Sequence, residues 1–526
     1  MKKVALLLTL GVALSSAAAW AEGTGTTYYQ DGKPIQEAQV NWGADIQRMQ
    51  DLGGDFGRFT DFSHGYGVDL PQHYKVDTSM SDVQIVLSDD RNRVEITNDN
   101  FANSVDSALS YVNFNKGFLK ERGNHLWMDT WTKVAGYRVH VISWSRDPLA
   151  HVPNDKNHYY VAEFIRSNTE VTTVEIKSMD PISINDRVLS SFRFSGKVGT
   201  SGIHKVFYKP TPNYSPQLDA FYKAMFSDNS PQRWGFFYNG ATVDMSGLLS
   251  LEKRTNYKFN TLIRYQTLDT PCPEAELQKA WDDGRTVELT LQTMLYNGDN
   301  GSMMYDILGG KYDNYFRQYA KDVKRFGKPV LFRLNNEMNG DWCVYSAYHY
   351  SRDPELYKAM WHYLHNVFKE EGADNVLWVW NPNAGDFPHF KWNSEYNYFP
   401  GESYVDVVGL TGYNTGTYYP GERWRTFDQI YASLYAEHTA RFSYPLMITE
   451  FGCNIVGGNK PEWVQDMFTK LPTYNRIKLI IWFDGTDLDS RGNPARTYRI
   501  DEDPATVEVF RANLTKFAGP VVPAIK

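Results

Sequence analysis

The chain has 526 residues, which is more than one average domain contains, so we expect two or three domains. Hydrophobic residues make up 42% and charged residues 22%, as in ordinary globular proteins. The formal net charge is −8 and the sequence holds no long basic run, which argues against nucleic acid as a partner. No stretch after residue 21 is long and apolar enough to span a bilayer.

The first residues have the pattern of a secretory signal peptide. Lys2 and Lys3 precede an apolar run, Val4–Leu14, and Ala19–Ala21 (AWA) has the small-x-small form of a cleavage site. We therefore expect residues 1–21 to be removed and the mature protein to be secreted or periplasmic.

The sequence contains three cysteines, Cys272, Cys343 and Cys453. In an exported chain an odd number allows one disulfide and one free thiol, or three unpaired thiols. Neither a CxxC pair nor a cluster of histidines and carboxylates with metal-ligand spacing is evident. We therefore expect no metal and no other cofactor, and we expect a monomer.

Residues 22–208 show a mixed pattern that predicts an α+β domain. One helix is expected around Ile46 to Leu52 and another from Phe101 into Lys116. Strand-like runs at 137–144 and 159–165 flank a polar loop and predict an antiparallel pair, and further strands are expected at 83–87, 94–97 and 171–176. No catalytic constellation is evident here, so the role of this domain stays open between a spacer, a polysaccharide contact and a docking site.

Three prolines in Lys209–Pro216 (KPTPNYSP) disfavour both helix and sheet, so residues 209–231 are predicted to be a linker. Residues 232–526 then alternate between strand and helix patterns, which favours a (β/α)8 TIM barrel preceded by the smaller α+β domain. The competing architecture is a doubly wound open sheet, but no glycine-rich phosphate loop follows any strand. The expected strands are Trp234–Tyr238, Thr261–Gln266, Val287–Thr293, Val330–Leu334, Val376–Trp380, Val405–Leu410, Leu446–Thr449 and Ile477–Phe483.

Two of these strands end in a glutamate. The segment 329–342 (PVLFRLNNEMNGDW) places Glu337 just after the fourth strand, and 445–452 (PLMITEFG) places Glu450 at the end of the seventh. A retaining glycosidase needs two carboxyl groups about 5–5.5 Å apart, one protonated to assist the leaving oxygen and one ionised to attack the sugar. The pair therefore predicts acid/base and nucleophilic chemistry on a glycoside.

The segments around both glutamates resemble those of a known family. The Asn336-Glu337 pair is similar to the Asn-Glu pair of clan A glycoside hydrolases, which are (β/α)8 barrels. Within that clan, Glu337–Trp342 (EMNGDW), Val379–Asn383 (VWNPN) and Thr449–Gly452 (TEFG) resemble glycoside hydrolase family 26, the β-mannanase family. The resemblance covers roughly residues 232–514. It implies that Glu337 is the acid/base, that Glu450 is the nucleophile, and that Asn336 bonds the sugar 2-hydroxyl.

The sequence also departs from that family. Asn336 stands where typical mannanases of the family carry histidine, and Cys343 begins a segment that lacks their tryptophan-rich run. Both positions are near the subsite that holds the sugar being cleaved. We therefore keep two substrates open, a mannan-type polymer and a bacterial exopolysaccharide, and we expect endo-acting cleavage.

Further site candidates lie at or near the ends of barrel strands. Arg264 and Arg333 either hold the nucleophile ionised or pair with structural carboxylates. Tyr413 follows the sixth strand, where the clan has a tyrosine that donates to the nucleophile. Three tryptophans are candidates for stacking on sugar rings, with core packing as the alternative for each: Trp342, Trp380 and Trp482.

The sequence leaves alternatives to a hydrolase. A polysaccharide-binding protein on an inactive barrel is one, although the presence of both Glu337 and Glu450 argues against it. A transglycosylase is another, because the same covalent intermediate can be passed to a sugar instead of water. Since both glutamates follow Pro216, we also expect a chain that begins near that residue to cleave a short substrate.

Overall fold

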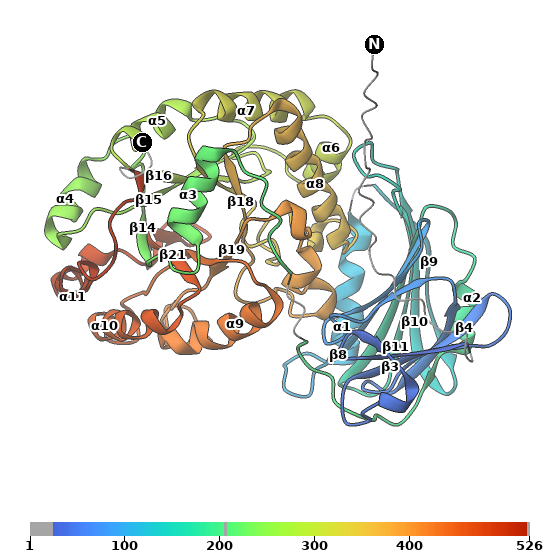
Figure 1. Ribbon diagram of the computed structural model, residues 1–526. Coiled ribbons are helices and arrows are strands. Elements are labelled where there is room, and N and C mark those ends of the chain that lie inside the picture. The colour runs from blue at the N-terminus through green and yellow to red at the C-terminus, as the bar shows by residue number, and fades with distance from the viewer. Residues whose placement is uncertain (1–24, 122, 205–207, 523–526) are drawn as a thin grey trace, which may run out of the picture.

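The computed structural model describes residues 25–121, 123–204 and 208–522. The predicted signal peptide therefore lies outside the described residues. A sheet-rich N-terminal part lies beside a barrel surrounded by helices (Figure 1). No helix in the described ranges is long and apolar enough to cross a membrane. All three cysteines are buried and free, so the arrangement without a disulfide is the one observed.

The N-terminal part consists of two antiparallel sheets that enclose a core between them. Phe59 and Leu70 of the first sheet pack with Ile96 and Phe164 of the second. The six-stranded sheet has the order β13 (Arg193–Phe194), β5 (Tyr66–Pro71), β4 (Phe56–Asp61), β3 (Ile46–Asp51), β1 (Thr26–Gln30) and β2 (Lys33–Ile35). The seven-stranded sheet has the order β6 (Lys75–Asp77), β7 (Ile85–Ser88), β8 (Asn92–Asn100), β12 (Glu170–Ser178), β11 (His158–Ile165), β10 (Tyr137–Arg146) and β9 (Asn124–Val134).

The helices of this part are few and short: α1 (Ala108–Asn115) and α2 (Asn185–Ser191). The helix expected around Ile46 to Leu52 is wrong, because this segment is β3 and pairs with both β1 and β4. The second predicted helix begins later than expected. Ser107 caps α1 by accepting from the backbone of Ser110, whereas Phe101 bonds its N–H to Thr169 beside the sheet.

The barrel predicted from the sequence is confirmed. Eight parallel strands close on themselves through the pair between the first and the last: β14 (Arg233–Tyr238), β15 (Thr261–Gln266), β16 (Thr286–Leu291), β17 (Val330–Leu334), β18 (Val376–Trp380), β19 (Val407–Thr411), β20 (Leu446–Phe451) and β21 (Ile477–Asp484). The outer helices are α4 (Ser246–Thr255), α5 (Glu274–Asp282), α6 (Met303–Leu308), α7 (Asp313–Phe326), α8 (Pro354–Glu371), α9 (Phe427–Arg441), α10 (Lys460–Lys470) and α11 (Pro504–Leu514). A small hairpin, β22 (Thr486–Leu488) with β23 (Pro494–Thr497), follows the last strand.

The predicted linker at 209–231 is only partly extended. Its second half contains helix α3 (Pro216–Phe226), with proline at the first helical position. Leu218 and Phe221 of α3 are buried against side chains that point into the barrel, among them Leu331 and Met447. The helix therefore closes the barrel at the end opposite to the strand carboxyl ends, and it packs as part of the barrel.

Candidate active site

Both predicted glutamates line one cavity of about 1280 Å³ at the carboxyl ends of the barrel strands. This is the end at which TIM barrels carry their active sites, since the loops after the strands meet there. The cavity also has aromatic walls and carboxylates from several loops. Its lining includes Phe237, Tyr265, Gln292, Asn336, Trp342, Phe387, Glu395, Tyr413, Glu422, Glu437, Phe483, Asp487, Arg496 and Tyr498.

Glu337 lies on a tight turn directly after β17. Its φ is 55° and that of Asn335 is 53°, a left-handed conformation that is unusual for residues other than glycine. The turn is held by its neighbours: the Glu337 N–H donates to the Asn381 carbonyl at 2.8 Å, and the Asn335 side-chain oxygen accepts from the Thr293 N–H at 2.7 Å. Backbone held in such a conformation is characteristic of functional sites.

The environment of Glu337 favours its protonated form. The pKa of this carboxyl is raised to about 8, mainly by burial and secondly by the nearby charge of Glu450. The indole N–H of Trp342 donates to Glu337 Oε2 at 3.2 Å and acts in the opposite direction. At neutral pH Glu337 therefore carries a proton that it can give to a leaving oxygen.

Glu450 is surrounded by hydrogen-bond donors. It is buried at the end of β20 and accepts hydrogen bonds on both oxygens. Tyr265 and Tyr413 donate to Oε2, the latter at 3.3 Å. Arg333 Nη1 donates to Oε1 at 3.1 Å and Asn336 Nδ2 at 3.5 Å. Four donors, one of them cationic, thus surround the side-chain oxygens of Glu450 and fix their position.

Arg333 acts from beneath the cavity. Its side chain is fully buried, and its Nε lies 2.6 Å from Glu288 Oε1 while Nη1 reaches Glu450. The guanidinium also donates to Thr290 Oγ1 at 2.8 Å and to Asn381 Oδ1 at 3.0 Å. Both alternatives that the sequence left open for Arg333 agree with this geometry, because it contacts Glu450 and also pairs with Glu288, and its full burial keeps it from the cavity. It is a positioning residue.

Three predicted site residues do not reach the cavity. Arg264 pairs with Glu276 of α5, with 2.7 Å between Nε and Oε2. Trp380 packs against Phe399 and Phe442 in the layer between the barrel and its helices. Trp482 is also fully buried, and its indole N–H donates to the Tyr498 carbonyl at 2.9 Å.

The cause is the alternation of side chains along a strand. Ile263 and Ile481 point into the barrel, so Arg264 and Trp482, their neighbours, point out toward the helices. The residues one position later, Tyr265 and Phe483, point in and line the cavity. Both were missed, although the parity of each strand could have identified them.

Sequence reasoning also missed Phe237, Gln292 and Tyr345. Phe237 and Phe483 stack with ring centroids 4.5 Å apart and form an aromatic floor. Gln292 Nε2 donates to Asn336 Oδ1 at 3.0 Å, as does the Tyr345 hydroxyl at 3.1 Å. These two donors turn the Asn336 amide so that its NH₂ group faces Glu450.

Trp342 and Tyr413 lie where the sequence predicts. Both line the cavity, and Trp342 is 51% exposed. Its ring lies 5.2 Å from that of Phe387, so the two form a wall beside Glu337. An exposed indole held by a hydrogen bond next to the acid is a suitable platform for a sugar ring.

The N-terminal part holds the loop that follows this wall. Asp99 accepts from the Lys391 N–H at 2.8 Å, and Asn115 Oδ1 accepts from the Trp392 indole at 3.1 Å. Phe390 packs against Tyr111 with ring centroids 4.9 Å apart. The segment after β18 therefore rests on α1 and on the end of β8.

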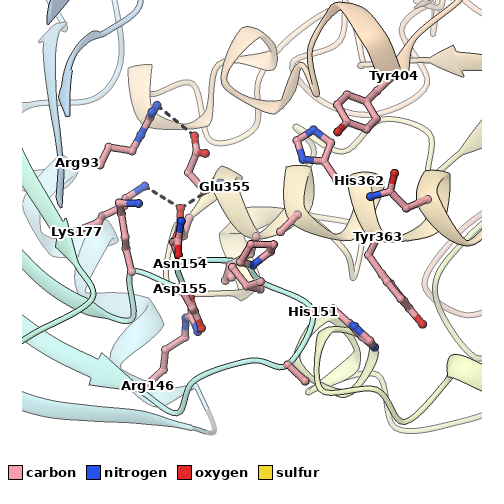
Figure 2. A pocket seen from close by; sticks show the side chains of 18 of the residues that line it. Arg93, Arg146, His151, Asn154, Asp155, Lys177, Glu355, His362, Tyr363 and Tyr404 are labelled. Atoms are coloured by element: carbon pink, nitrogen blue, oxygen red, sulfur yellow. Dashed lines mark hydrogen bonds and ion pairs between the residues drawn. The ribbon is translucent and has the colours of Figure 1, made fainter. Parts of the chain in front are cut away.

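A second cavity, of about 710 Å³, lies between the two parts (Figure 2). Figure 2 shows Arg93 directed toward Glu355 of α8, and their atoms are 3.1 Å apart. Lys177 of β12 pairs with Asp353, which caps α8, at 2.7 Å. The charged groups that line this cavity are largely paired with one another, and they fix the N-terminus of α8 to the seven-stranded sheet.

A closed (β/α)8 barrel with one glutamate just after its fourth strand and another at the end of its seventh has the architecture predicted for clan A glycoside hydrolases. Residues 275–467 match the family model described as Glycosyl hydrolase family 26. The relationship to this family that the motifs predict is therefore confirmed over residues 275–467, which include Glu337 and Glu450.

Curated relatives agree over part of their length. Endoglucanase H of Acetivibrio thermocellus is 31% identical over 235 residues, which are 44% of this chain and 24% of that protein. A mannan endo-1,4-beta-mannosidase of Bacillus subtilis is 36% identical over 173 residues, 28% of this chain and 45% of that protein. The chain thus spans between 18% and 46% of the length of these curated relatives.

Solved structures that the chain matches include the Bacillus subtilis mannanase man26, with a TM-score of 0.39 and 18% identity, covering 53% of this chain and 89% of that one. The catalytic domain of a Bacillus sp. JAMB-750 GH26 endo-beta-1,4-mannanase has a TM-score of 0.43 and 17% identity, covering 57% of this chain and 91% of that one.

Proposed function

We propose that this protein is an exported, retaining β-glycoside hydrolase that cleaves a polysaccharide internally, with Glu337 as acid/base and Glu450 as nucleophile. The observation that carries the proposal is the contrast between two glutamates on one cavity. Burial and a like charge favour the protonated form of Glu337, whereas four donors converge on the side-chain oxygens of Glu450. The relationship to family 26 supports glycoside hydrolysis.

In the first step Glu450 attacks the anomeric carbon while Glu337 gives its proton to the departing glycosidic oxygen. The glycosidic bond breaks and an ester forms between the sugar and Glu450. In the second step Glu337, now ionised, takes a proton from water, and the hydroxide attacks the anomeric carbon and frees Glu450. Two inversions give overall retention. To the amide of Asn336, which faces Glu450, we assign the donation to the 2-hydroxyl of the reacting sugar.

The size and charge of the cavity bear on the substrate. Its volume of about 1280 Å³ exceeds the about 300–1,000 Å³ of typical small-molecule sites, so it has room for several sugar units. Carboxylates outnumber arginines in its lining, and Arg496 is paired with both Glu422 and Asp487. This charge disfavours polyuronates and favours a neutral polymer, either mannan-type or a neutral bacterial exopolysaccharide.

The decisive experiment traps the intermediate. A 2-deoxy-2-fluoro glycoside with a good leaving group slows breakdown of the glycosyl-enzyme, so mass spectrometry should find the label on the peptide that contains Glu450. Manno- and gluco-configured probes are used in parallel. Glu437→Gln, at a carboxylate of the same cavity, is the matched control and should still be labelled at Glu450. NMR of the first product should show retained configuration; an inverted product or a label on another carboxylate would disprove the assignment.

A further inference from the structure

The cavity that holds both glutamates continues beyond them along one face of helix α9. The α9 residues in its lining are spaced so that they share this face: Gln429, Ile430, Ser433, Leu434 and Glu437. From the first to the last of these is about 12 Å at about 1.5 Å per residue. Ala384 and Glu395, from the segment after β18, also line the cavity. We call the part of the cavity between this face of α9 and these two residues the α9 lobe.

The α9 lobe exists because an α-helix is missing beside α9. In a (β/α)8 barrel each strand is followed by an α-helix. The residues between β18 and β19, 381–406, are all described, and they form only short 3-10 helices: Lys391–Asn393, Glu395–Tyr398 and Glu402–Tyr404. This segment covers α9 incompletely, so Ser433 is exposed and Leu434 is only partly buried.

The place of the lobe around the barrel shows which part of the substrate it takes. Glu337 follows β17 and Glu450 ends β20, so a sugar chain that passes between them lies over β18 and β19 on one side and over β21, β14, β15 and β16 on the other. The second side carries the aromatic floor of Phe237 and Phe483 and the Tyr265 hydroxyl that donates to Glu450. The reacting sugar therefore lies on that side, and the side with the α9 lobe receives the part of the polymer that leaves.

The side chains of the lobe suit a neutral sugar. Ile430 and Leu434 offer apolar surface to the C–H groups of a ring. Glu395 is 9% exposed, and burial together with the neighbouring Asp386 carboxyl raises the pKa of Glu395 well above its ordinary value. A protonated carboxyl can donate a hydrogen bond to a hydroxyl group. Apolar walls with a few placed polar groups are the usual composition of a binding site for a small molecule.

Both walls of the lobe are held in place. Asp386 accepts from Asn339 Nδ2 at 2.9 Å and from the Glu395 N–H at 3.0 Å, which ties one wall to the turn after β17. Arg441, the last residue of α9, is fully buried and pairs with Asp82 of the N-terminal part at 2.6 Å. Walls that are already fixed lose little conformational entropy when a ligand binds between them.

We propose that the α9 lobe binds sugar units of the leaving part of the polymer beyond the unit next to the cleaved bond, and that Glu395 donates a hydrogen bond to a sugar hydroxyl there. This inference rests on the proposed function, because that function gives Glu337 and Glu450 their roles. It adds a specificity: oligosaccharides that are short on the leaving side are poor substrates.

The first test locates the bond that the full-length wild type cleaves. Its substrates are manno- and gluco-oligosaccharides of increasing length and fragments of a neutral bacterial exopolysaccharide. Hydrolysis in water labelled with heavy oxygen marks the new reducing end, so mass spectrometry identifies the cleaved bond. The wild type should place more than one sugar unit on the leaving side, and kcat/KM should rise as that side is extended.

The second test fills the lobe. Ser433→Trp should lower kcat/KM for the extended oligosaccharides at least about fivefold, which is about the effect of one lost hydrogen bond. It should also move the cleaved bond so that fewer units lie on the leaving side. The matched control is Ala432→Trp, which adds the same bulk at an exposed position of α9 that does not line the cavity, and it should behave as the wild type. Hydrolysis of an aryl glycoside, whose leaving group is too short for the lobe, should be unchanged in both variants.

The third test concerns Glu395 itself. Glu395→Ala should weaken cleavage of the extended oligosaccharides, whereas Glu395→Gln, which keeps a donor, should restore most of it. Both variants should cleave the aryl glycoside at the wild-type rate. This pair also tests the lobe by a second route that does not depend on how α9 accepts a tryptophan.

The outcomes separate this inference from the proposed function. If the wild type cleaves the aryl glycoside but gains nothing from sugar units on the leaving side, the α9 lobe is overturned and the proposed function stands. Equal losses in Ser433→Trp and Ala432→Trp, or in Glu395→Ala and Glu395→Gln, also overturn it. A wild type that cleaves no glycoside removes the proposed function and the lobe with it.

Discussion

Replacing Glu288 with glutamine should change how the stability of this protein depends on pH. Glu288 lies on β16 inside the barrel and pairs with Arg333, and Arg333 also pairs with Glu450. One positive charge cannot neutralise two buried carboxylates. Burial raises the pKa of Glu288 to about 8, and repulsion from Glu450 adds to this effect while Arg333 opposes it.

The sign follows from proton binding. A carboxyl whose pKa is higher in the folded state than in the unfolded state makes folding retain a proton. The stability that Glu288 contributes is fully present below pH 4.5, the usual pKa of a glutamate, and is lost as the pH rises through about 8, its pKa in the folded protein. Each unit of pKa difference corresponds to about 1.36 kcal/mol, so the difference between the folded and unfolded pKa sets an upper limit of about 5 kcal/mol on the loss of unfolding free energy. Relaxation around the site should reduce this to a measurable loss of about 1–3 kcal/mol.

Glu288→Gln keeps the shape of the side chain and removes its titration. Urea unfolding midpoints at pH 5, 6.5 and 8 should fall more steeply for the wild type than for the variant, and the variant should be the more stable protein at pH 8. Glu508→Gln, at an exposed position of α11, is the matched control and should follow the wild type. If Glu288→Gln destabilises by the same amount at every pH, Glu288 is ionised throughout and the reasoning is wrong.

Three further predictions concern the cavity and its support. Activity should fall as the pH rises through about 8, because Glu337 must be protonated. In pH–rate profiles, Glu337→Ala should abolish this alkaline decrease. The variant should cleave natural substrates about 10²–10⁴ times more slowly but substrates with activated leaving groups at nearly the wild-type rate. Trp342→Ala should raise KM, whereas Trp482→Phe should cost at least about 1 kcal/mol of stability with KM unchanged. The sequence alone predicts that a chain beginning near Pro216 still cleaves a short substrate, but the contacts between the two parts lead us to expect that a chain beginning at Lys209 loses most activity. Full activity of that chain would uphold the sequence prediction and show that the N-terminal contacts are dispensable.

The barrel could be predicted because its pattern is local. Each strand is a short apolar run, each following helix has its own period, and a carboxylate at a strand end stands out against a buried strand. Glu337 and Glu450 could be found in this way before any contact was known. The identity of their partners required one more step, the inward or outward direction of each strand residue. Choosing Arg264 over Tyr265 inverted that direction.

The N-terminal sheets were harder to predict, because the pattern of apolar residues in a segment does not show which other strands it pairs with. Ile46 to Leu52 has apolar residues at spacings that suit one turn of a helix, and only pairing with β1 and β4 makes it a strand. The role of Asn115 and Asp99 could not be predicted at all, since each bonds a barrel residue more than 270 positions away.

The strongest sign that both parts act as one unit is Arg352, on the barrel loop that follows Trp342. Its guanidinium is buried at the seven-stranded sheet, 3.7 Å from Glu163 and over the Phe118 ring at 5.0 Å. Its φ is 55°, so the loop accepts an unfavourable backbone conformation there. Buried charges are stable only when they are paired, and here the carboxylate comes from the other part of the chain. Removing the N-terminal part would expose this loop to water and free the backbone that leads from Glu337 to α8. This is why the shortened chain is expected to lose activity, although every group proposed to react with substrate lies beyond Pro216.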